Sequence, residues 1–137
     1  MTINLNYLLT RKDFTTSLNN TLNEIVAGEG FLWTEVTGPQ ALTTNNGYVT
    51  NNSSLVTLTL PVTAAFGGII EVCGKGAGGW KIALNANQTI HCGSQDTTTG
   101  VTGSITSQST FDTIRLLCTT DNSNWTMLSM IGNLTII

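Results

Sequence analysis

The residues of this chain that could bind a metal ion or act as thiol nucleophiles are few. The single histidine, His91, precedes Cys92, and the other cysteines are Cys73 and Cys118. Adjacent residues on a strand point to opposite faces, so His91 and Cys92 cannot readily chelate one ion, and no C-x-x-C or H-x-x-x-H spacing occurs. Three cysteines cannot pair completely, and each lies in an apolar, strand-like run. We therefore expect buried free thiols, no metal site and no cofactor.

The acidic residues could serve hydrolysis only if two of them faced each other across a bond. Six of the eight are instead isolated along the sequence from residue 29 onward: Glu29, Glu35, Glu71, Asp96, Asp112 and Asp121. No G-x-S-x-G elbow and no Cys–His signature accompanies them. The sequence therefore predicts a protein that is not an enzyme. A depolymerase-like enzyme whose carboxylates meet across a subunit boundary remains an alternative.

The densest glycine run, from Gly74 to Gly79, superficially resembles a nucleotide-binding loop. A phosphate loop needs a helix N-terminus directly after the glycines, whereas the segment from Trp80 to Leu84 has a strand pattern. We expect a hairpin bend with close backbone approach here.

The tryptophans, Trp33, Trp80 and Trp125, together with Tyr48, raise the possibility of sugar binding, because saccharide faces stack on aromatic rings. Trp80 and Trp125 nevertheless share their strand parity with apolar residues, which favours a place in the core. A sugar-binding platform is the alternative.

The composition favours strands and turns over helices. Charged residues make up only 9% of the 137 residues, well below the roughly 25% of typical domains, while Thr, Asn, Ser and Gly are abundant. The net charge is −3, and the five basic residues are scattered. Nucleic acid and anionic membrane are therefore improbable partners. A surface so poor in charge favours self-association, which buries apolar area.

Hydrophobic periodicity divides the chain at Gly30. Residues 1–30 are expected to form an N-terminal arm and an amphipathic helix, because apolar residues between Lys12 and Ala27 recur every three or four positions. The helix could form a short coiled coil or lie on its own domain. Its candidate oligomerisation residues are Phe14, Leu18, Leu22 and Ile25.

Residues 31–137 alternate with a period of two and are interrupted by frequent turn signals. This pattern predicts an all-β domain with the fold of an antiparallel sandwich or a jelly roll. The expected strands are Phe31–Thr37, Tyr48–Thr50, Leu55–Leu60, Ile69–Gly74, Trp80–Leu84, Gln88–Cys92, Thr113–Thr119, Trp125–Met130 and Leu134–Ile137.

The N-terminus lacks a basic region followed by a long apolar run, and no stretch approaches the roughly 20 apolar residues of a membrane span. We expect neither a signal peptide nor membrane insertion. The chain should therefore be made in the cytosol.

From Trp33 onward the chain resembles a module of phage tail-fibre tips and related bacterial fibre or adhesin-like proteins. The resemblance lies in an ordered series of short motifs. They are Trp33, Asn46-Gly47-Tyr48, Leu58-Thr59-Leu60-Pro61, Gly67-Gly68-Ile69-Ile70-Glu71-Val72, Gly74-Lys75-Gly76-Ala77-Gly78-Gly79-Trp80-Lys81-Ile82, Gln88-Thr89-Ile90-His91, Thr98-Thr99-Gly100, Gly103-Ser104-Ile105, Asp112-Thr113-Ile114-Arg115-Leu116, Trp125 and Gly132-Asn133.

The resemblance implies a trimeric, β-structured tip or spacer, displayed on a virion fibre and assembled in the host cytoplasm. It would join a larger fibre or virion component through its N-terminus and contact a cell-surface glycan or protein receptor. The recurring Trp, Gly and Leu-Pro positions would be framework, and variable loops would carry specificity. The candidate receptor-binding residues are Ser94, Gln95, Asp96 and Thr97, followed by Asn51 and Asn52.

Two hypotheses follow. The first is a non-enzymatic trimeric fibre module in which weak contacts gain avidity from multivalency. The second is a monomeric carbohydrate-binding module of a bacterial protein with an exposed tryptophan.

Overall fold

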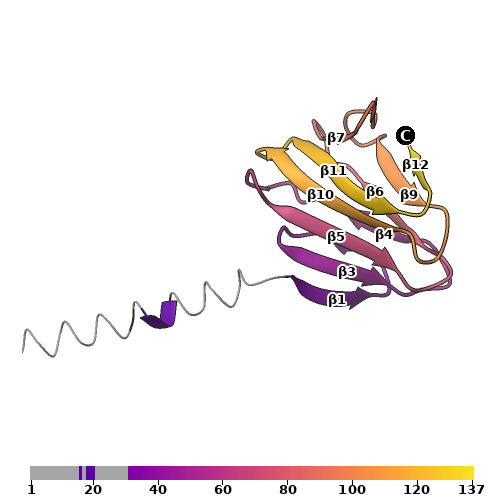
Figure 1. Cartoon of the computed structure of the whole chain (residues 1–137), viewed down its shortest axis with the longest axis horizontal. Coiled ribbons are helices and arrows are strands. Elements are labelled where there is room, and N and C mark those ends of the chain that lie inside the picture. The colour runs from indigo at the N-terminus through magenta and orange to yellow at the C-terminus, as the bar shows by residue number, and fades with distance from the viewer. Residues whose placement is uncertain (1–15, 17, 21–30) are drawn as a thin grey trace, which may run out of the picture. The chain divides into compact units, whose positions relative to one another are not determined.

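The computed structural model describes Thr16, residues 18–20 and residues 31–137 (Figure 1). The chain divides into two compact units, Met1–Phe31 and Leu32–Ile137, which are described separately. In the first unit Thr16 and residues 18–20 are helical, and Leu18 is exposed. The other predicted oligomerisation residues, Phe14, Leu22 and Ile25, lie outside the described residues. No helix among the described residues is long and apolar enough to cross a membrane.

The second unit consists of two β-sheets in a sandwich-like arrangement, as the sequence predicted at this level (Figure 1). The seven-stranded sheet has the order β1 (Leu32–Val36), β3 (Asn46–Thr50), β5 (Ile69–Gly74), β10 (Thr113–Thr120), β11 (Asn124–Ile131), β7 (Thr89–Cys92) and β8 (Gln95–Asp96). The five-stranded sheet has the order β12 (Leu134–Ile136), β9 (Ser104–Ser107), β6 (Trp80–Ala83), β4 (Val56–Thr59) and β2 (Gln40–Ala41).

The pairing within both sheets is mixed, so the prediction of an antiparallel sandwich or jelly roll is wrong in this respect. From β1 to β6 successive strands belong alternately to the two sheets. As a result, β1, β3 and β5 pair in parallel in one sheet, and β2, β4 and β6 pair in parallel in the other. Among the described strands, only β7–β8 and β10–β11 are consecutive and antiparallel. Most of the other connections carry the chain from one sheet to the other, and we call these connections arches. Successive arches stack on each other.

Glycines allow these arches to stack at close range. Gly76 packs on Asn52, and Gly78 on Ser54, so closely that a Cβ on either glycine would overlap the backbone of the neighbouring arch. The backbone N–H of Gly78 donates to the carbonyl of Asn52 at 2.9 Å. The glycine run is therefore a sheet-to-sheet arch rather than the predicted hairpin, while its predicted close backbone approach is confirmed.

The core lies between the sheets and is built from the inward residues of both. Leu42, Leu60 and Leu84 occupy equivalent positions, one residue beyond the last paired residue of β2, β4 and β6, and all three are buried. Each buried leucine contributes roughly 1.5–3 kcal/mol of hydrophobic stabilisation. Trp80 and Trp125 are fully buried, as predicted, and Trp80 Nε1–H donates to the carbonyl of Asp112 at 2.8 Å.

Candidate functional site

Trp33 lies on β1, the edge strand of the seven-stranded sheet, directly beside Gly47 of β3. Three carbons of its indole lie 2.5–2.7 Å from the place that a Cβ of Gly47 would occupy. Only glycine therefore leaves room for the ring over this part of the sheet. Trp33 is 51% exposed, whereas Trp80 and Trp125 are 0% exposed.

The row that contains Trp33 continues across the outer face of the sheet. Gly47 pairs with Glu71, Glu71 with Arg115, and Arg115 with Ser129. Arg115 Nε lies 3.0 Å from Glu71 Oε1. This contact is an ion pair without hydrogen-bond geometry, because the Nε–H has no hydrogen-bond partner among the described residues.

A second ion pair lies on the same face, two residues along β1 from Trp33. Lys75 Nζ donates to Glu35 Oε2 at 2.8 Å, and Asn51 Nδ2 donates to Glu35 Oε1 at 3.0 Å. The hydrogen bond from Asn51 and the contact with Lys75 hold the pKa of Glu35 below its ordinary value. We call the set Trp33, Glu35, Asn51, Glu71, Lys75 and Arg115 the Trp33 face.

The Lys75–Glu35–Asn51 arrangement places an amine and an amide on one carboxylate, so attack of the Lys75 amine on the Asn51 amide carbon is the reaction to consider. That reaction needs a neutral amine and a proton donor. Here both charged side chains are about half exposed, and the lowered pKa of Glu35 keeps it ionised at neutral pH. The charged, half-exposed side chains do not favour this reaction, and the arrangement joins the ends of the neighbouring strands β1, β3 and β5.

The predicted receptor-binding residues Ser94, Gln95, Asp96 and Thr97 lie in and beside the β7–β8 hairpin. The first three are exposed. Thr97 is buried, and its hydroxyl accepts the backbone N–H of Ile90 at 2.9 Å. The structure thus assigns Thr97 an internal role and leaves the other three available for contact.

The predicted residues Asn51 and Asn52 lie in the arch between β3 and β4, five strand spacings from β8 in the sheet order. At about 4.8 Å per spacing, roughly 24 Å separates them from the hairpin, so the structure does not unite the two groups. Asn52 Nδ2 donates to the carbonyl of Thr37 at 2.7 Å, and its Oδ1 accepts the N–H of Ser54. Asn52 holds the arches together, whereas Asn51 belongs to the Trp33 face.

His91 is paired with Asp96 across the β7–β8 hairpin, with 2.8 Å between Nδ1 and Oδ1. This hydrogen bond raises the pKa of His91, against a small opposing effect of burial. Burial raises the pKa of the neighbouring Cys92 to about 11, and the charge of Asp96 adds to it. A thiol with such a pKa is a weak nucleophile at neutral pH.

The three cysteines are free, and the prediction of burial is confirmed for Cys118, while Cys73 and Cys92 are half-buried. Among the described residues, no three His, Cys, Asp or Glu side chains lie close enough together to hold a metal ion.

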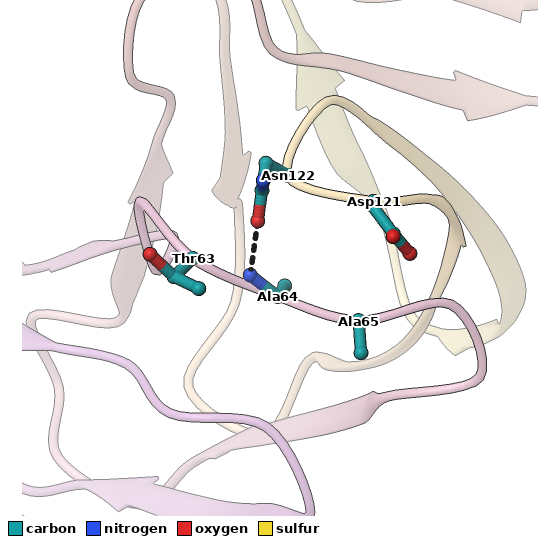
Figure 2. A pocket seen from close by; sticks show the side chains of 5 residues that line it. All are labelled: Thr63, Ala64, Ala65, Asp121 and Asn122. Atoms are coloured by element: carbon teal, nitrogen blue, oxygen red, sulfur yellow. Dashed lines mark hydrogen bonds between the residues drawn. The ribbon is translucent and has the colours of Figure 1, made fainter.

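An open hollow of about 180 Å³ is lined by Thr63, Ala64, Ala65, Asp121 and Asn122, whose side chains are drawn in Figure 2. Two of its side chains already accept hydrogen bonds from the backbone. Asn122 Oδ1 accepts the N–H of Ala64 at 2.8 Å, and Asp121 Oδ1 accepts the N–H of Phe66 at 2.7 Å. These hydrogen bonds connect the β4–β5 loop to the β10–β11 turn, so the residues around the hollow have a structural role.

A separate apolar region follows the second half of β11. β7 pairs with β11 only from Asn124 to Thr126, so the remaining edge of β11 faces no other described strand. Leu128, Met130 and Ile131 are exposed there, and Ile131 is 70% exposed. We call residues 127–131 the β11 edge.

Sequence reasoning missed the position of Trp33, which the resemblance assigned to the framework. The sequence signal was the combination of Trp33 and Gly47, because an indole can lie flat against a sheet only where the neighbouring residue has no side chain. The resemblance also assigned Gly47, in the Asn46-Gly47-Tyr48 motif, to the framework. No protein-family model matches the chain, and no curated protein matches it either.

Proposed function

We propose that the chain is a non-enzymatic attachment module, the trimeric tip of a tail fibre or receptor-binding protein displayed on a virion. Its N-terminal unit would join the larger particle, and its β-domain would contact a host cell surface. The β11 edge carries this proposal, because it combines unpaired strand backbone with exposed apolar side chains. Such edges promote strand pairing between chains unless they are covered.

Light scattering of the full chain tests the proposed self-association. We expect a trimer at micromolar concentration, and Ile131→Asp should weaken it by placing a charge in the interface. Val62→Asp is the matched control, because Val62 is equally exposed but lies in the β4–β5 loop. A strictly monomeric wild-type chain would contradict the proposal.

A monomeric carbohydrate-binding or adhesin module is the second candidate function, and the exposure of Trp33 favours it. The tryptophans proposed earlier for a platform, Trp80 and Trp125, are both buried, which leaves Trp33 for this role. A glycan array on wild type and Trp33→Ala would test it. Glycan binding by a monomer, lost in the variant, would favour this candidate over a fibre tip.

A further inference from the structure

The Trp33 indole offers a broad apolar surface on the outer face of the seven-stranded sheet, near Glu35, Glu71 and the half-buried Val49. It lies against Gly47 and is 51% exposed. Close packing on the backbone of β3 restricts the ring, so little side-chain freedom is lost when a ligand stacks on it. Ligands suited to it have one apolar face and polar groups around their rim.

Polar groups stand on two sides of this ring. Glu71 lies one strand spacing, about 4.8 Å, beyond Gly47, and Arg115 lies two spacings beyond it. Along β1, Glu35 follows Trp33 by two residues on the same face. A carboxylate accepts several hydrogen bonds, and a guanidinium donates up to five. The terminal nitrogens of Arg115 make no hydrogen bond within the described residues and can donate to a ligand.

The charge of the Trp33 face selects against an acidic ligand. Its two carboxylates, Glu35 and Glu71, are balanced by Lys75 and Arg115 in two ion pairs. The chain as a whole carries −3, so no positive field attracts an anion. A neutral ligand with several hydroxyl groups fits this balance.

From these observations we infer that the Trp33 face binds a neutral pyranose. The C–H face of the sugar stacks on the Trp33 indole, while its hydroxyls donate to the carboxylates of Glu35 and Glu71 and accept from Arg115. The inference deepens the proposed attachment function, on which it rests for the source of the sugar, a glycan at the host surface. One such contact is weak, and three copies would raise the avidity.

Nuclear magnetic resonance of the three indole N–H groups tests the inference in the full chain. The probes are methyl β-galactopyranoside and methyl β-glucopyranoside, with the open-chain polyol mannitol and the acidic sugar N-acetylneuraminic acid as controls. We expect one pyranoside to shift the Trp33 signal at millimolar to tens of millimolar concentration, with the Trp80 and Trp125 signals unchanged. Trp33→Phe identifies the Trp33 signal by its disappearance.

Variants test the two halves of the site separately, with the pyranoside followed by its own NMR line broadening. Trp33→Ala should abolish binding, and Gly47→Ala should weaken it because the new Cβ displaces the indole. Arg115→Gln should weaken binding roughly three- to tenfold, as expected for loss of one hydrogen-bonding partner. Phe66→Ala, at a more exposed aromatic residue in the β4–β5 loop, should leave binding unchanged.

The inference is overturned if neither pyranoside shifts the Trp33 signal at these concentrations, or if mannitol or N-acetylneuraminic acid shifts it equally. It is also overturned if Trp33→Ala and Arg115→Gln, with their thermal unfolding unchanged, bind like wild type. Light scattering on the same samples keeps the two proposals distinguishable. A trimer without pyranoside binding overturns only the sugar site, and a monomer that binds overturns only the fibre-tip assembly.

Discussion

The inner and outer faces of the seven-stranded sheet are built from the same strands but contact different surroundings. Inward residues such as Ile70, Ile114 and Trp125 are fully buried against the five-stranded sheet. Outward residues on the same strands include an exposed indole and two ion pairs. The buried inner face therefore supplies most of the stability of the domain, whereas the outer face remains partly exposed to solvent.

Exchanging tryptophans for alanine on the two faces should show the largest difference. Trp80→Ala removes a fully buried ring and its hydrogen bond to Asp112, and we expect a loss of about 3–5 kcal/mol in unfolding free energy. Trp33→Ala should cost less than about 1 kcal/mol because its ring is half exposed. Urea denaturation measures both. Equal losses would erase the distinction between the faces.

The arches that connect the sheets should be the next most sensitive region. Gly76→Ala places a Cβ into the backbone of Asn52, and we expect a destabilisation of about 1–3 kcal/mol from overpacking. Gly38→Ala is the matched control, because no atom lies within 4 Å of its added Cβ. Thermal unfolding of both variants measures the effect. A normal melting temperature for Gly76→Ala would argue against tightly stacked arches.

The ion pairs of the outer face should contribute little to stability. Lys75→Gln and Glu35→Gln leave the core untouched, and exposed ion pairs are screened by water. We expect unfolding curves that overlay the wild-type curve within error. A clear destabilisation by both variants would mean that the outer face also maintains the fold.

A pH titration should resolve the smallest effect, at the His91–Asp96 pair. The folded-state pKa of His91 is raised above 6.5, so the pair adds stability below pH 6.5, and this stability is lost as the pH rises through the raised value. The imidazole proton signals should titrate with a midpoint above 6.5, and Asp96→Asn should lower that midpoint. An unchanged midpoint in Asp96→Asn would show that Asp96 is not the cause.

The two-residue alternation predicted most strands of the domain and the burial of Trp80 and Trp125. The short strands Gln40–Ala41 and Gln95–Asp96 were missed because two residues show no period, and Ser104–Ser107 was also missed. Parallel pairing was missed for another reason. Asn45 and Asn87 have positive φ, as turn residues do, but a turn signal does not specify which sheet the chain enters next.

The candidate site was harder to predict than the fold. Alternation places Trp33 on one face of its strand but does not tell whether that face is covered. Its exposure follows from the edge position of β1 and from the pairing with Gly47, and both depend on parallel register. Of the candidate receptor-binding residues, Ser94, Gln95 and Asp96 are exposed, because short polar segments lie at the surface, whereas Thr97 is buried.

Oxidation of the tryptophans by N-bromosuccinimide, located by peptide mass spectrometry, tests the division between the two faces most directly. We predict rapid modification of Trp33 alone, with Trp80 and Trp125 protected until the domain unfolds. Comparable modification rates at all three tryptophans, or protection of Trp33 alongside the other two, would contradict the assignment of Trp33 to an exposed contact face.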